Sequence, residues 1–361
     1  MATKKKGKSR QGRSSRKRTA GSGHSRVVYI HGIGDQLPPV ALKREWDLAL
    51  FGRDMGGQTE MAYWSDILHG TQPRTMAAAG SRSLDVDTLL ERAGLGDTPG
   101  AQVLADALIA RFGVSAGSGG ARKKVLPLPA FLRKPIARTF LNSLVGDSAA
   151  YFFKPAVRRS IQQRLREVLT KPGDPVTLVA HSQGSVVALE VLASLAKTRP
   201  VAVEQLVTIG SPLGITEVQD FLECPLEIPR GIKAWMNFAD PLDPVALDKG
   251  IRSDFSPRVI DDELVLNTNT RKLEGFNPHS AVGYLAHPKV RDSVHRSARI
   301  DKHARFLVAR DLAANLAVEA RHSVLLEILE PRYPAVGEST EETRAHETKV
   351  EKGRTDLQTR I

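Results

Sequence analysis

The stretch from Val176 to Leu189 constrains the fold of this chain most strongly. After Gly173-Asp174-Pro175 it opens with a short, β-branched apolar run, which is typical of a strand buried on both faces. From Val186 onward the apolar spacing becomes helical, and His181-Ser182-Gln183-Gly184 lies between the two patterns. A strand, a tight turn and a helix, with serine at the apex, would raise the serine hydroxyl above the edge of a sheet.

Small residues flank this turn, which favours a close approach of backbone and helix. Ala180 and Gly184 stand two residues before and two residues after Ser182. Glycine is usual at both positions, so Ala180 is a mild departure. An ordinary strand-to-helix turn with a capping serine is the alternative interpretation. The order of other polar residues along the chain favours the interpretation in which Ser182 is a nucleophile.

A glycine-containing loop follows the first expected strand, upstream of Ser182. The loop reads His31-Gly32-Ile33-Gly34. It lacks the third glycine of a dinucleotide loop, and Pro38-Pro39 stands where that helix should start. Glycines let backbone amides turn toward a developing negative charge, so the pattern predicts an oxyanion loop. The expected amide donors are those of Ile33 and Gln183, with Gly34 as a further candidate, and His31 and Gly32 are expected to support the loop.

A serine hydroxyl is unreactive until a neighbouring base takes its proton, and His279 is the best candidate for that base. It follows the last expected strand and opens a helix. His287 and His295 lie within or beyond that helix. His181 is adjacent to Ser182 along the chain, so we expect the turn to direct its side chain elsewhere.

The triad acid is expected after the strand that precedes the histidine. Asp240 and Asp243 both follow the expected strand 232–239. We predict Asp243, because Pro244 turns the chain back into the body and leaves the carboxylate at the sheet edge. Asp240 stays the alternative acid, or it fixes the turn through local hydrogen bonds. Such an acid holds the imidazole tautomer and stabilises the imidazolium.

Strands and helices alternate along the chain, which predicts an α/β fold with a mainly parallel, doubly wound sheet. The expected strands are 27–30, 60–64, 176–180, 203–209, 232–239 and 263–266. The expected helices are 40–51, 84–93, 101–112, 147–169, the segment after Ser182, and the segment after Pro278. We expect one domain over 26–296 with a helical, lid-like insertion at about 70–150. A mostly helical extension (297–335) and a charged loose tail (336–361) are expected to follow.

The positive charge of the chain is concentrated at its N-terminus. Residues 1–25 hold nine Lys or Arg and no acid, which leaves 43 basic and 40 acidic residues for the rest. Low hydrophobicity and high charge predict a disordered tail. Solubilisation is the favoured role, and contact with an anionic membrane or nucleic acid is the alternative. The tail offers no aromatic residue for stacking on bases.

Other motifs exclude several classes of protein. Cys224 is the single cysteine, so an intrachain disulfide is excluded. No apolar run reaches the length of a membrane span, and no secretory signal precedes the fold. We therefore expect a cytoplasmic protein, with peripheral membrane attachment as the alternative. The sequence has no His-Glu-x-x-His motif and no phosphate loop, so we expect no metal and no cofactor.

Together, His31 to Gly34, Ala180 to Gly184, Asp240 to Val245 and His279 resemble the α/β-hydrolase superfamily. More narrowly, they are similar to lipase-like serine esterases that include inositol-deacylase-like enzymes. The resemblance covers about residues 26–290 and matches the insertion poorly. It implies an ester hydrolase without a cofactor, acting on a small-molecule or lipid ester. The competing hypothesis is a catalytically silent fold, a binding module that its basic tail recruits to membrane or nucleic acid.

Overall fold

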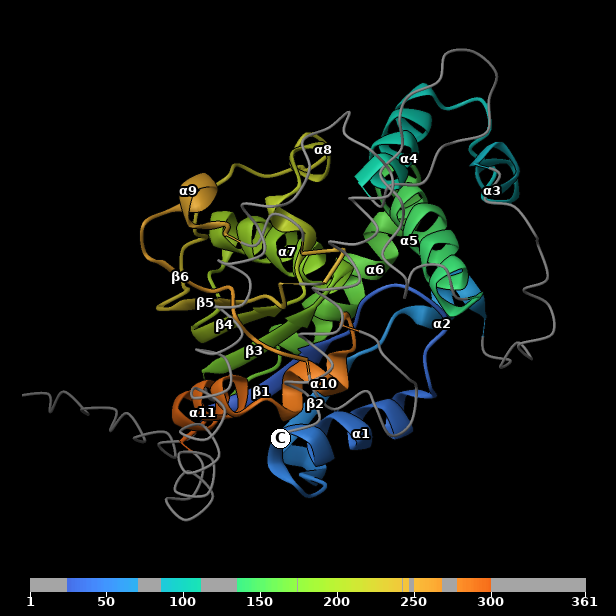
Figure 1. The fold of residues 1–361 in the computed structure, drawn as a ribbon. Coiled ribbons are helices and arrows are strands. Elements are labelled where there is room, and N and C mark those ends of the chain that lie inside the picture. The colour runs from blue at the N-terminus through green and yellow to red at the C-terminus, as the bar shows by residue number, and fades with distance from the viewer. Residues whose placement is uncertain are drawn as a thin grey trace, which may run out of the picture.

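A six-stranded parallel sheet forms the centre of the molecule (Figure 1). The computed structural model describes residues 25–70, 86–111, 135–173, 175–241, 243–246, 250–267 and 278–299. The strand order is β2-β1-β3-β4-β5-β6, and every neighbouring pair is parallel. The strands are β1 (Arg26–Ile30), β2 (Thr59–Ala62), β3 (Val176–His181), β4 (Val203–Ile209), β5 (Trp235–Phe238) and β6 (Val259–Asp262).

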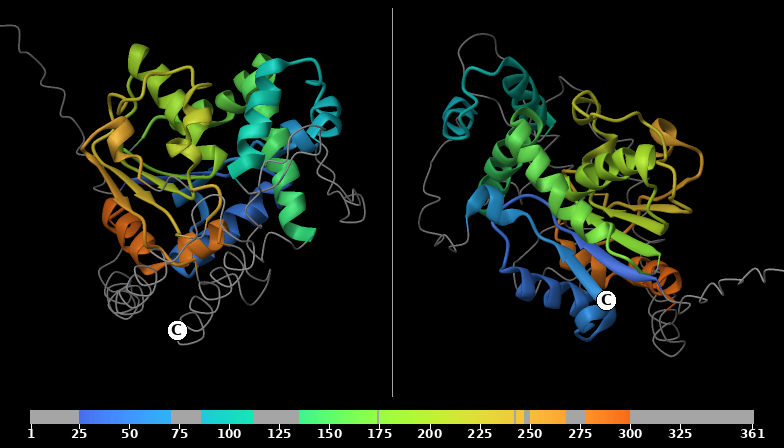
Figure 2. Two further views of the ribbon diagram at one scale, coloured as in Figure 1. Left: turned by 45° about the horizontal axis from the view of Figure 1, so that its top comes forward. Right: turned by 180° about the vertical axis from the view of Figure 1, so that it is seen from behind.

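Helices cover both faces of the sheet (Figures 1 and 2). One face carries α5 (Pro135–Phe153), α6 (Pro155–Leu169) and α7 (Gln183–Thr198). The other carries α1 (Pro39–Phe51), α10 (Ala281–Ala286) and α11 (Pro288–Ser297). The remaining helices are α2 (Ser65–His69), α3 (Val86–Arg92), α4 (Pro99–Arg111), α8 (Thr216–Gln219) and α9 (Arg252–Phe255). The predicted α/β class with a parallel sheet is therefore confirmed.

The central strand β3 is buried along its whole length, as its continuous apolar sequence predicts. Its side chains alternate between the two hydrophobic cores. Leu178 and Ala180 join the core under α7, and Val179 joins the core under α1 and α10. Because both faces of the sheet are covered in this way, the turn at the carboxyl end of β3 is supported by a packed layer on each side.

Two predicted elements are wrong. The last strand is Val259–Asp262 and not 263–266. Beyond it the chain leaves the ladder, although the Val265 amide still donates to the Ala239 carbonyl. The single helix expected over 147–169 is two helices, because Pro155 has no amide proton and cannot continue α5.

The ends of the expected domains are only partly described. Ser25 already belongs to the fold, since its hydroxyl lies 2.7 Å from that of Thr177 and donates to the Ser297 carbonyl. Residues 1–24, the insertion segments 71–85 and 112–134, and nearly all of the expected C-terminal extension and tail lie outside the described residues. None of the helices that the structure describes is long and apolar enough to cross a membrane.

The sheet reverses its strand order between β1 and β3. The chain leaves β1 outward to β2 through α1 on one face. It leaves β3 in the opposite direction, to β4, through α7 on the other face. In open α/β sheets, ligands bind outside the carboxyl ends of the strands at this switch point. Here those two strand ends carry the loop after Ile30 and the turn at Ser182.

Candidate active site

Ser182 occupies a strained turn between β3 and α7. Its backbone has φ 54° and ψ −133°, a region that few residues other than glycine adopt. The Ser182 amide donates to the Ile209 carbonyl at 3.1 Å, so the turn is anchored on the neighbouring strand. A Cβ on Gly184 would lie 2.5 Å from the His31 carbonyl oxygen. Likewise, a Cβ on Gly32 would lie 2.5 Å from the Cβ of Ser182. Both glycines let the turn press directly on the loop after β1.

His279 connects Ser182 to an aspartate. Its Nε2 lies 2.9 Å from Ser182 Oγ, and its Nδ1 lies 2.9 and 2.8 Å from the two oxygens of Asp243. The carboxylate accepts the Nδ1 proton, so the Nε2 lone pair faces the Ser182 hydroxyl and can accept its proton. A Cβ on Gly210 would lie 2.7 Å from Asp243 Oδ2, so glycine is needed at the end of β4 for this approach. All three side chains of the Ser182–His279–Asp243 cluster are buried.

The two candidate aspartates have different partners. Asp243 contacts His279, and it also accepts hydrogen bonds from the Val245 amide at 2.9 Å and the Tyr284 hydroxyl at 2.7 Å. Asp240 Oδ2 accepts the Asn267 amide at 2.8 Å. Asp240 therefore ties the loop after β5 to the segment after β6, through a long-range hydrogen bond and not the local one that its alternative interpretation expected.

Buried side chains hold the loop that carries His279. Asn267 Nδ2 donates to the carbonyls of Pro278 and Ser280, at 2.9 and 2.8 Å. His181 Nε2 donates to the carbonyl of His279 at 2.8 Å. Three successive carbonyls are thus held by two side chains. His181 does not contact the Ser182 hydroxyl; it positions the loop of the candidate base instead.

The loop after β1 is equally well fixed. The His31 ring stacks on Trp64 with 4.8 Å between the ring centroids. Its Nε2 accepts the Trp64 amide at 2.9 Å, and its Nδ1 donates to the Gly32 carbonyl at 2.8 Å. These contacts agree with a supporting role for His31, and they leave the loop little freedom to move.

One of the three expected amide donors is already engaged. The Gly34 amide donates to Asp147 Oδ2 at 2.7 Å, and His69 Nε2 donates to the same oxygen at 3.0 Å. Gln183 is the first residue of α7, so its amide has no acceptor within the helix. Of the three expected donors, the Gly34 amide is thus engaged by Asp147, whereas the Gln183 amide has no acceptor within its helix.

Burial sets the protonation of the neighbouring groups. It lowers the pKa of His31 to about 4. Burial also lowers the pKa of His181 well below its ordinary value, and the nearby His279 lowers it further. Burial, followed by the carboxylates of Asp243 and Asp240, raises the pKa of Tyr284 well above its ordinary value. Both accessory histidines are thus neutral, and Tyr284 keeps its proton, across the physiological range.

Four residues of this arrangement were missed at the level of sequence. They are Asp147, Gly210, Asn267 and Tyr284. No motif in the sequence marks any of these four residues as a neighbour of Ser182. A buried tyrosine needs a hydrogen-bond partner for its hydroxyl, but the sequence does not indicate which residue that partner is.

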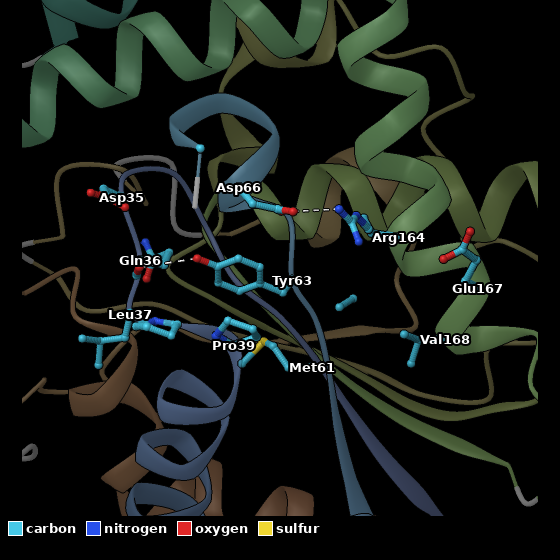
Figure 3. Close-up of a pocket in the computed structure, with 13 residues that line it drawn as sticks. Asp35, Gln36, Leu37, Pro39, Met61, Tyr63, Asp66, Arg164, Glu167 and Val168 are labelled. Carbon is cyan, nitrogen blue, oxygen red and sulfur yellow. Dashed lines mark hydrogen bonds and ion pairs between the residues drawn. The ribbon is translucent and has the colours of Figure 1, made fainter. Parts of the chain in front are cut away.

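A separate pocket of about 640 Å³ lies beside the edge strand β2 (Figure 3). Its walls come from the loop 35–39, from β2 and from α6. An ion pair joins Arg164 and Asp66 at 2.7 Å, and the Tyr63 hydroxyl faces the Gln36 carbonyl at 3.4 Å. Neither Ser182, His279 nor Asp243 lines it. The pocket is therefore distinct from the candidate active site, although the loop 35–39 continues from the loop after β1.

Comparison of the chain with protein-family models, with curated proteins and with solved structures found no match.

Proposed function

We propose that this protein is a serine hydrolase of α/β-hydrolase type that cleaves a carboxylic ester. One observation carries the proposal: a strained serine, a histidine and an aspartate form a continuous hydrogen-bonded chain at the carboxyl ends of parallel strands. The strain matters because a residue kept in a sparsely populated conformation marks a functional site more often than a structural one. The order Ser182, Asp243, His279 is that of α/β-hydrolases.

In the proposed reaction, Ser182 Oγ attacks the ester carbonyl carbon while His279 Nε2 takes its proton. The carbonyl oxygen becomes an oxyanion, which the amides of Ile33 and Gln183 stabilise. Collapse of this intermediate breaks the bond to the alcohol, which leaves with the proton from His279. Water then attacks the acyl-serine by the same route and releases the acid. Asp243 stabilises the imidazolium in both halves of the reaction.

The nucleophile is tested with a fluorophosphonate probe, which reacts only with an activated serine. We expect stoichiometric labelling of the wild-type chain and none of Ser182→Ala, whose turnover of a short-chain ester should fall by roughly 10⁴-fold or more. Ser194→Ala is the matched control, because Ser194 lies on the same helix and contacts Arg166 instead. Labelling of Ser182→Ala at the wild-type rate would end the proposal.

The base is tested by combining variants. His279→Ala should cost about as much as Ser182→Ala, and the double variant little more, since the residues act as one unit. Strictly multiplicative losses would remove His279 from the mechanism. If the folded wild-type chain is not labelled at all, the binding-module hypothesis replaces this one.

A further inference from the structure

We infer that Tyr284 is a positioning residue that tunes the candidate base through Asp243, an inference that rests on the proposed function. Tyr284 lies on α10, fully buried, with its hydroxyl 2.7 Å from Asp243 Oδ2. No hydrogen bond joins Tyr284 to Ser182, and the Tyr284 hydroxyl donates to the Asp243 carboxylate. Its effect therefore reaches the reaction through the Asp243–His279 hydrogen bond.

The direction of the tyrosine hydrogen bond is determined by its other partner. The Asp240 amide donates to the Tyr284 hydroxyl oxygen at 2.8 Å. An amide can only donate, and an ionised carboxylate can only accept. The hydroxyl hydrogen must therefore point at Asp243. Burial keeps Tyr284 protonated, so this donor is present at every pH at which the site could work.

A donor on the carboxylate competes with the imidazole for its negative charge. Asp243 accepts from His279 Nδ1, from Tyr284 and from the Val245 amide. Each additional donor spreads the charge and weakens the attraction that the carboxylate exerts on an imidazolium. Tyr284 thus keeps His279 neutral, and able to accept the Ser182 proton, at a lower pH than Asp243 would otherwise allow.

Other ionisable groups near the pair do not supply this effect. His181 of β3 faces His279 with 4.6 Å between the ring centroids, and its lowered pKa leaves it neutral. The Asp240 carboxylate accepts the Asn267 amide, and the Asp240 backbone amide donates to the Tyr284 hydroxyl.

The two helices packed against α10 also carry buried ionisable groups. In α1, the carboxylate of Asp47 is bonded to Lys43, Tyr29 and Thr59. At the start of α11, His287 accepts the Lys289 amide. None of these hydrogen bonds involves Asp243.

The test measures the rate of fluorophosphonate labelling against pH for wild type and Tyr284→Phe, so it needs no identified substrate. Phenylalanine keeps the ring and removes the donor. Without the hydroxyl donor, the His279 imidazole holds its proton more tightly. The acid limb of the profile is the pH range over which the labelling rate falls as His279 is protonated, and it should move to higher pH by about one unit. On the acid side of the limb the rate then falls roughly tenfold, while the plateau at high pH changes little.

Tyr29→Phe is the matched control. Tyr29 is also fully buried and also donates to a buried carboxylate, Asp47, at 2.9 Å. Its loss should lower stability without moving the acid limb. If the acid limb moves equally in Tyr284→Phe and Tyr29→Phe, Tyr284 contributes only to packing and the inference is wrong.

Site-specific replacement of Tyr284 by 3-fluorotyrosine keeps the test decisive if Tyr284→Phe does not fold. The fluorinated phenol is a stronger donor of nearly the same shape, so the acid limb should move to lower pH. An unchanged limb in every folded Tyr284 variant overturns the inference and leaves the proposed function standing. A wild-type chain that is not labelled sinks the proposed function itself.

Discussion

Two of the buried polar clusters in the described part of the chain differ in how completely their charges are paired. The first is the Ser182–His279–Asp243 cluster. The second, the Arg158–Glu190 cluster, joins α6 to α7. Glu190 accepts from Arg158 Nε at 3.1 Å, from Gln162 Nε2 at 3.0 Å and from the Glu223 amide at 2.8 Å, and also from the Tyr151 hydroxyl. Arg158 and Glu190 are only 5% and 4% exposed.

The Arg158–Glu190 cluster pairs a permanent cation with a carboxylate, and its polar atoms are committed to fixed partners. The Ser182–His279–Asp243 cluster pairs its carboxylate with an imidazole, which is charged only when protonated. It ends in a hydroxyl on a strained residue. Burial of polar groups is common to both. Balanced charge favours a structural role for the first, whereas strain and a transferable proton favour a chemical role for the second.

The largest expected effect comes from replacing Asp243, whose carboxylate contacts the candidate base His279. Asp243→Asn should lower kcat by about 10⁴-fold, because an amide no longer holds the tautomer with a proton on Nδ1. Asp240→Asn keeps an oxygen that can accept the Asn267 amide, and we expect less than about a tenfold loss. Kinetics of both folded variants check this. If Asp240→Asn alone abolishes turnover, the assignment of the acid is reversed.

A smaller effect, on stability, should follow from breaking the Arg158–Glu190 cluster. Glu190→Gln leaves the buried Arg158 charge without its main partner, which should lower the free energy of unfolding by about 3 kcal/mol. Urea denaturation measures this change. Glu204→Gln is the control: it removes an ion pair with the exposed Lys233, which should cost less than about 1 kcal/mol. Equal costs for the two variants would contradict the distinction between the clusters.

An effect of similar size concerns the pH dependence of stability near the candidate site. Burial lowers the pKa of His31 to about 4 in the folded chain, below the ordinary value of about 6.5. The unfolded chain therefore binds more protons between these values, and stability is lost as the pH falls from about 6.5 to 4. The loss is on the order of 3 kcal/mol.

His31→Gln removes this titration and still offers a donor and an acceptor. The difference in unfolding free energy between wild type and His31→Gln should therefore shrink as the pH falls from 7 to about 4. Denaturation at several pH values measures it. A constant difference across that range would show that His31 is not buried in its neutral form.

Local patterns in the sequence were sufficient for the parallel α/β sheet and for the turn at Ser182. The apolar run of β3 and the small residues at 180 and 184 belong to one continuous stretch, so their geometry depends on near neighbours. The same reasoning failed at the last strand. The segments 259–262 and 263–266 both contain short apolar runs, and only the first forms the strand. It also failed at Lys154, where a helical spacing continues across Pro155 although the backbone cannot.

The sequence by itself determined the order in which the serine, the aspartates and the histidine appear, and the strand ends on which they stand. The sequence favoured Asp243 and kept Asp240 as the alternative. Only the tertiary structure gave these two aspartates different partners, because the partners lie more than 20 residues away along the chain. Likewise, only the tertiary structure placed Tyr284, Asn267 and Asp147 beside the candidate site. A hydrogen bond depends on distance and direction between atoms, and neither is encoded in the spacing of residues along the chain.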